Sequence, residues 1–115
     1  MTLVQKVPVR FYRSGSGGEP GRDWLKSLSK AGKRILGEDI ATVQYGWPVG
    51  MPLVRKMEPN LWELRSRLPD GIARTFFTMH GNEMVLLHGF VKKSAKTPED
   101  ELAIARRRMK EVRNA

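Results

Sequence analysis

Basic side chains gather in the second half of the chain, on and just after three strand-like segments. They are interspersed with apolar residues and continue beyond the last segment, at Arg65, Arg67, Arg74, Lys92, Lys93 and Lys96. Arg and Lys donate charge-assisted hydrogen bonds to phosphate oxygens, so this pattern is typical of a surface that holds a nucleic-acid backbone. No thiol nucleophile and no obvious set of metal ligands accompanies them. Any chemistry here would therefore rest on positive charge and positioning.

The charge of the whole chain points the same way. Lys and Arg number 21 against 12 Asp and Glu, which gives a formal net charge of +9, and the pI is about 10.4. Such a balance is the usual electrostatic footprint of a nucleic-acid-binding domain. It also fits a protein that is neutralised by an acidic partner. A solvated basic surface without a polyanionic partner is the remaining interpretation.

The length of 115 residues fits one ordinary domain, so we expect a single domain over residues 1–115. The chain contains no cysteine, which excludes disulfides and thiolate metal sites and is compatible with a reducing cytosol. It shows neither a secretory leader nor a run of about 20 apolar residues that could span a membrane. These features predict a soluble, cytoplasmic protein.

The first half of the sequence predicts one strand and two helices. Residues 7–12 are rich in β-branched and aromatic side chains and are expected to form a strand. After a loop rich in Gly and Ser, Asp23 can cap a short helix. Apolar spacing predicts a second helix over 31–45, which Gly46 is expected to end in a left-handed conformation. The Pro- and Gly-containing segment 47–52 is expected to be a loop.

The strands that carry the basic residues are expected at 61–68, 72–79 and 83–91, after a possible short strand at 53–57. Alternation along the first of them places Trp62 and Leu64 on one face. It places Glu63, Arg65 and Arg67 on the other face. Pro-Asp-Gly and His-Gly-Asn turns connect the three strands, and strands joined so tightly must be antiparallel.

A helix closes the sequence. Thr97 is expected as its N-cap and Pro98 as its first residue, and three acidic residues follow in the first turn, where the helix dipole favours negative charge. An apolar stripe follows at Leu102, Ala105, Met109 and Val112. The expected order of elements is β-α-α-β-β-β-α, an α+β fold.

Three motifs carry a resemblance to a known family: LWELR at 61–65, GIARTFF at 71–77 and VLLHGFVKKSAKTP at 85–98, followed by a helix that ends in basic residues. Together they resemble the RelE/HigB superfamily, and within it the phage-derived HigB-like branch. The resemblance implies a toxin of a type II toxin–antitoxin pair, with a twisted antiparallel sheet and helices packed on one side. It further implies a metal-independent endoribonuclease without a cofactor, which cleaves mRNA on the ribosome. The implied partner is a cognate antitoxin, a small helix-turn-helix protein.

RNA cleavage without a metal uses the 2′-hydroxyl as nucleophile and needs a base, an acid and cations for the charged phosphorane. The resemblance assigns Arg74 to phosphate and transition-state stabilisation, because it stands where the family has its catalytic arginine. The alternative is an ion pair between Arg74 and Glu63. The ELR motif favours a catalytic role for Arg65, whereas Arg67 is expected to bind RNA or to be a solvated surface charge.

Lys92 and Lys93 follow the last strand, where relatives carry a second catalytic cation. Alternation places them on opposite faces, and we expect Lys93, rather than Lys92, to point into the site. Ser94 and Lys96 would line its rim and contact RNA. The alternative is a basic loop between a strand and a helix.

The general base stays open. His88 lies within an apolar strand and is expected to be half-buried and hydrogen-bonded, and His80 is expected to be exposed in a turn. Histidines act as acid–base groups in other branches of the superfamily, so such a role remains a hypothesis. Several relatives carry a tyrosine near the C-terminus, but the tyrosines of this chain are Tyr12 and Tyr45.

Two other classes of function compete with the enzyme. The chain could be a non-catalytic basic module that holds RNA or an acidic antitoxin. It could also be a toxin homologue that serves only as a regulatory subunit of an operon repressor.

Overall fold

The structure is a computed structural model and describes residues 6–92 and 98–114. Those residues form a five-stranded sheet and three helices: β1 (Val9–Phe11), α1 (Pro20–Ser27), α2 (Lys30–Gly46), β2 (Val54–Glu58), β3 (Leu61–Leu68), β4 (Gly71–His80), β5 (Glu83–Lys92) and α3 (Glu99–Arg113). The α+β class is confirmed. The strand suggested at 53–57 exists as β2, so the order is β-α-α-β-β-β-β-α, one strand longer than expected.

The sheet is mixed, which corrects the expectation of an antiparallel one. Its strand order is β1-β5-β4-β3-β2. Strands β2 to β5 form antiparallel pairs, but β1 runs parallel to β5, with Val9 opposite Met84. Tight turns dictate antiparallel pairing only between consecutive strands. Most of the chain separates β1 from β5, so that connection is long enough for a parallel pair.

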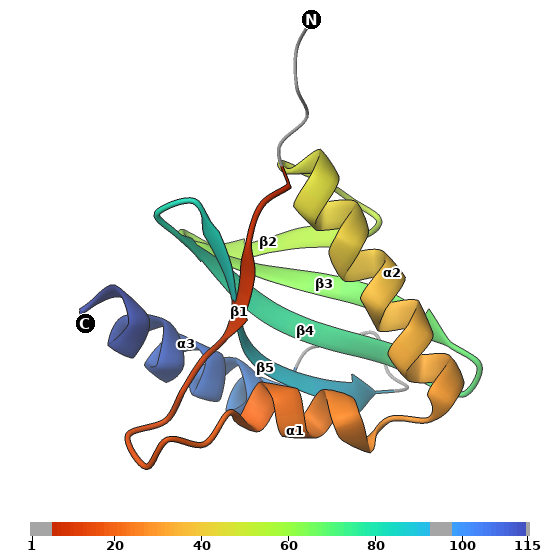
Figure 1. Cartoon of the computed structure of the whole chain (residues 1–115), viewed down its shortest axis with the longest axis horizontal. Coiled ribbons are helices and arrows are strands. Elements are labelled where there is room, and N and C mark those ends of the chain that lie inside the picture. Colours follow the sequence, from red (N-terminus) through yellow and green to blue (C-terminus); the bar gives the residue numbers. More distant parts are fainter. Residues whose placement is uncertain (1–5, 93–97, 115) are drawn as a thin grey trace, which may run out of the picture.

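Helices cover both faces of the sheet, whereas the resemblance implied helices on one side. Figure 1 shows the strands between α2, in yellow, and α3, in blue. Two separate apolar clusters result, and β4 contributes Phe76 to the cluster under α3 and Phe77 to the cluster under α2. Strands β4 and β5 are apolar on both faces, so leaving either face open would expose a large apolar patch.

Helix α1 lies on the same face as α2. Its Trp24 packs its ring against Gly89 of β5, at a point where no other residue type leaves space. The loop after α2 is anchored on this face as well. The Trp47 ring meets the rings of Trp62 and Phe77 edge to face, with centroids 5.0 and 5.6 Å apart. This apolar layer fixes the position of α2 beside β3.

The two N-terminal helices begin and end slightly differently from the prediction. Helix α1 begins at Pro20, which suits a first helical position, and Asp23 lies inside its first turn instead of capping it. Helix α2 begins after Ser29, whose hydroxyl accepts a hydrogen bond of 3.1 Å from the Gly32 N–H. Gly46 is its last residue and does not adopt a positive φ, so no left-handed residue ends this helix.

Helix α3 has Pro98 as its N-cap, in an extended conformation, rather than as its first helical residue. The expected cap, Thr97, lies outside the described residues. The acidic first turn is present, and the side chains of Leu102, Ala105 and Val112 are buried against the sheet. Of the helices in the described part of the chain, none has the length and apolar character to cross a membrane.

Candidate functional site

The register of the sheet brings four of the predicted site residues to one end of one face. Arg65 pairs with Arg74 across β3 and β4. Ile72 pairs with Arg67 on one side and with Lys92 on the other. Residues directly opposite on antiparallel strands share a face. The four strand-end cations, Arg65, Arg67, Arg74 and Lys92, therefore lie on the face that α3 covers in part.

Arg74 is the innermost of these cations. Its side chain is 0 % exposed, and its Nη1 donates to both carboxylate oxygens of Glu63, at 3.1 and 3.3 Å. Glu63 is also 0 % exposed. The ion pair that was the alternative for Arg74 is thus present. Charges buried this deeply must be paired, because removal from water costs each of them several kcal/mol.

The other three cations are increasingly open to solvent. Arg65 is held from the side, with its Nε 3.8 Å from Glu63 Oε1, and about a quarter of its side chain (24 %) is exposed. Its Nε–H has no hydrogen-bond acceptor among residues 6–92 and 98–114. Lys92 is half-buried and Arg67 is exposed. A phosphate approaching from solvent would therefore meet these three side chains before it met Arg74.

A hollow of about 280 Å³ lies beside Arg65 and Arg67. Its other walls are Ile35 and Asp39 of α2 and Pro52 and Leu53 of the preceding loop. A smaller hollow of about 40 Å³ shares Pro52 and the two arginines and reaches Ile72. The two share three lining residues at the end of β3, and we call them together the strand-end hollow.

The hollow exists because β2 is short. Val54, the first residue of β2, pairs with Leu64, and the Arg65 N–H donates to the Leu53 carbonyl at 2.8 Å, so the part of β3 beyond Arg65 has no strand on its outer side. Pro52 stands where an extension of β2 would have to continue, and proline cannot donate to a ladder. The sequence thus leaves the sheet edge open beside Arg67, directly after Arg65.

Three predicted site residues, Lys93, Ser94 and Lys96, lie outside the described residues, so their roles stay predictions. The same holds for the preference for Lys93 over Lys92. Lys92 itself is placed by the sheet. It is two residues beyond Phe90, which pairs with Arg74, and alternation keeps it on the same face as that arginine.

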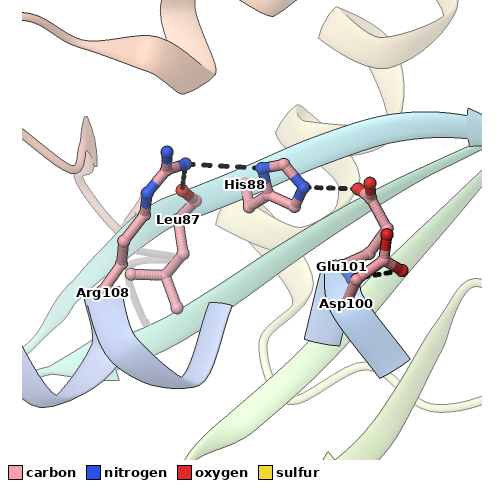
Figure 2. A network of polar contacts seen from close by, with 5 residues as sticks. All are labelled: Leu87, His88, Asp100, Glu101 and Arg108. Atoms are coloured by element: carbon pink, nitrogen blue, oxygen red, sulfur yellow. Dashed lines mark hydrogen bonds and ion pairs between the residues drawn. The ribbon is translucent and has the colours of Figure 1, made fainter. Parts of the chain in front are cut away.

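His88 belongs to a polar network between β5 and α3, which Figure 2 shows from close by. Its Nδ1 lies 3.4 Å from Nη1 of Arg108, which also donates to the Leu87 carbonyl at 2.8 Å. A guanidinium can only donate, so Nδ1 accepts, and the Nε2–H donates to the Glu101 carboxylate. Burial lowers the pKa of Arg108. The expectation of a half-buried, hydrogen-bonded His88 is confirmed, and both of its ring nitrogens are engaged.

Glu101 and Arg108 were not singled out from the sequence. Neither lies at a recognisable spacing from His88, and only the docking of α3 on β5 brings the three side chains together. The one signal for Glu101 in the sequence is the acidic first turn of α3, which the helix dipole is enough to explain. His80 also differs from its expectation, since it is half-buried at the end of β4 rather than exposed.

Tyr12 is engaged with α3 as well. Its hydroxyl donates to Glu111 at 2.8 Å, and the Arg108 guanidinium lies over its ring, 5.2 Å from the centroid. The hydrogen bond to the Glu111 carboxylate is the main cause that raises the pKa of Tyr12, with burial second. Tyr12 therefore anchors the C-terminal half of α3, as His88 anchors its first turns.

Within the described ranges, no three His, Cys, Asp or Glu side chains gather in a group that could hold a metal ion. The strand-end cations can instead neutralise negative charge, and the buried Glu63 carboxylate holds two of them, Arg65 and Arg74, in place.

Comparison with known proteins gives the family. No match was found among curated proteins. Residues 23–110, from within α1 to near the end of α3, match the family described as phage-derived protein Gp49-like (DUF891). This range includes all four strand-end cations and the His88 network. The chain therefore belongs to the Gp49-like family of phage-derived proteins, a family of RelE-like toxins of toxin–antitoxin systems.

Proposed function

We propose that this chain is the toxin of a type II pair in the HigB-like branch and an endoribonuclease that cleaves mRNA on the ribosome without a metal. Membership of a toxin family supports the first part. The observation that carries the second part is the convergence of Arg65, Arg67 and Lys92 on one end of one sheet face. Their backbones lie within two strand spacings, roughly 10 Å.

These cations suit the charge that develops during RNA cleavage. The 2′-hydroxyl attacks the adjacent phosphorus, the bond to the 5′-oxygen of the next nucleotide breaks, and a 2′,3′-cyclic phosphate remains. Arg65 and Arg67 would bind the phosphorane oxygens, because planar guanidinium groups match phosphate geometry and stay charged. Among the strand-end cations, only Lys92 is of a type that can exchange a proton with the reacting oxygens.

Arg74 takes a different role from the one that the resemblance implied. Its side chain is 0 % exposed and donates to Glu63, which supports a role behind the site rather than in direct contact with a phosphate. It holds Glu63, and Glu63 lies beside Arg65, so Arg74 is a positioning residue that acts through these two side chains. A cation fixed in place before the reaction stabilises a transition state better than one that must reorient.

A non-catalytic alternative keeps one observation in its favour. Two side chains of types that serve as general bases are engaged elsewhere: His88 with Glu101 and Arg108, and Tyr12 with Glu111. A chain that lacked a base would bind RNA through the same cations and leave it intact. It would then act as a binding or regulatory module.

The partners follow from the same proposal. The site of action would be the ribosome in the cytoplasm, and a small helix-turn-helix antitoxin would neutralise the chain. The net charge of +9 favours an acidic antitoxin, because complementary charge accelerates association and suppresses wrong partners.

The test is cleavage of a short mRNA bound to purified ribosomes in the presence of a metal chelator compatible with ribosome integrity. Wild-type protein should release fragments that end in a 2′,3′-cyclic phosphate. Arg65→Ala should lower the cleavage rate on the order of 10²–10³-fold, as the loss of one transition-state donor does. Arg34→Ala is the control, since Arg34 is an exposed cation on α2 that pairs only with Glu38 among the described side chains.

Three outcomes separate the hypotheses. Fragments from ribosome-bound mRNA but not from free mRNA support the ribosome-dependent enzyme. Salt-sensitive RNA binding without fragments supports the binding module. Intact mRNA and no binding, with folded wild-type protein, would contradict both proposals.

A further inference from the structure

The strand-end hollow combines three kinds of surface within one small volume. Ile35, Pro52 and Leu53 give it apolar walls. Arg65 and Arg67 give it positive charge on the side of the sheet. Its main volume of about 280 Å³ is at the lower end of small-molecule pockets, which begin at about 300 Å³. This size accommodates one nucleotide.

Asp39 is the unexpected residue of the hollow. Its carboxylate is half-buried and makes no ion pair or hydrogen bond with any described residue, although two arginines line the same hollow. A carboxylate repels phosphate, so its presence is unfavourable for a site that binds only a backbone. It is favourable if the ligand also brings hydrogen-bond donors, because an ionised carboxylate only accepts.

A nucleotide meets all three requirements. Its base is flat and largely apolar on its faces, which suits walls of Ile, Pro and Leu. Its phosphate suits the arginines. Adenine, cytosine and guanine carry an exocyclic amino group that can donate to Asp39, as cytosine does to Asp or Glu in DNA readout. Uracil has no amino group, and its single N3–H donor stands between two carbonyl oxygens, which repel a carboxylate that approaches this edge.

We propose that the strand-end hollow is a base-selective subsite, which binds one RNA nucleotide with its phosphate on Arg65 and Arg67 and selects amino-bearing bases over uracil through Asp39. This inference rests on the proposed function, because it takes RNA as the ligand. It adds to that function the class of nucleotide preferred next to the cleaved bond and the residue that sets the preference.

The probes are the four nucleoside 5′-monophosphates, titrated into the full chain and followed by NMR through the backbone amides of Asp39, Arg65 and Arg67. AMP, CMP and GMP should bind on the order of 10-fold more tightly than UMP, the size of one hydrogen bond to a charged group. Each should shift the amide signals around Asp39. This readout does not depend on cleavage, so it stays informative if the chain is not an enzyme.

Asp39→Asn is the decisive variant. An asparagine amide can donate to uracil as well as accept, so UMP binding should become on the order of 10-fold tighter and the preference should disappear. The gain for UMP cannot come from a damaged fold. Glu38→Gln is the matched control: it removes the same charge from the neighbouring position, where Glu38 is exposed and pairs with Arg34. It should leave the preference unchanged.

Several results would overturn the inference. Equal binding of all four monophosphates by wild-type protein would exclude base selection. Shifts confined to the arginine amides would show a phosphate site without a base subsite. An equal effect of Glu38→Gln and Asp39→Asn would reduce the role of Asp39 to bulk charge. Cleavage of ribosome-bound mRNA regardless of base, with any of these results, would leave the proposed function intact.

Discussion

Arg65 of β3 and Arg74 of β4 stand directly opposite each other, and the Glu63 carboxylate lies 3.8 Å from the first and 3.1 Å from the second. Like charges in directly opposed positions destabilise a sheet. Here the shared carboxylate offsets their repulsion. The three side chains form a chain of contacts: the buried Arg74 orients Glu63, and Glu63 orients Arg65, which is partly exposed.

Arg74→Ala should destabilise the fold by about 1.5–3 kcal/mol, because it removes the hydrogen bonds that Arg74 donates to the buried Glu63 carboxylate and leaves Arg65 at 3.8 Å as a more distant cation. Urea denaturation measures this as a lower transition midpoint. The control is Arg67→Ala, which removes an exposed cation from the same sheet face and should change stability by no more than about 0.5 kcal/mol. Equal stability of the two variants would show that the ion pair between Arg74 and Glu63 does not stabilise the fold.

Two glycines should respond to alanine with opposite signs. A Cβ on Gly89 would overlap the six-membered ring of Trp24, so Gly89→Ala should cost about 3 kcal/mol or more and loosen α1. Gly37 lies within α2 with nothing near its missing Cβ, so Gly37→Ala should stabilise by about 0.5–1 kcal/mol. Thermal unfolding of both variants checks this. A stabilising Gly89→Ala would mean that Trp24 does not pack there.

The contact between His88 and Glu101 should hold the start of α3. Glu101→Gln weakens a charge-assisted hydrogen bond, and we expect a loss of about 1–3 kcal/mol and faster amide hydrogen exchange in the first turns of α3. Glu99→Gln removes the same charge two residues earlier, where the side chain is 83 % exposed, and should have little effect. Identical amide hydrogen exchange in the two variants would show that the contact between His88 and Glu101 does not stabilise the start of α3.

Tyr12 should give stability a dependence on alkaline pH. Its pKa is raised in the folded state, so its contribution is fully present below the ordinary value of about 10 and is lost as the pH rises through the folded value. Tyr12→Phe should cost about 1 kcal/mol at neutral pH, and the gap to wild type should narrow above pH 10. Denaturation at pH 8 and pH 11 measures both. A gap that widens with pH would contradict the hydrogen bond to Glu111.

The three strands that carry the site could be predicted almost to the residue, because local signals determine them. The strand from Leu61 to Leu68 alternates cleanly, and turn residues stand at both connections. The ion pair between Glu63 and Arg74 could also be predicted, as the alternative to a catalytic role for Arg74. Its complete burial could not, because Arg and Glu are rarely buried and their burial depends on how distant segments pack around them.

What escaped prediction depends on contacts between distant segments. The parallel pairing of β1 leaves no local pattern, since Val9 and Met84 are far apart in the chain. The second helical layer did leave a signal, because the nearly continuous apolar run of β5 is typical of a strand that is buried on both faces. The strand-end hollow required the register of Val54 with Leu64, which decides where the outer strand begins.

The parallel strand β1 also bears on how the protein is made. On the ribosome, Val9 is synthesised 75 residues before its partner Met84. At roughly 5–20 residues per second, the first strand waits several seconds for its neighbour. Until β5 has emerged, the nascent chain has neither a closed sheet nor Lys92 beside the arginines. A chain released before β5 is made therefore lacks the cation that β5 places beside the arginines.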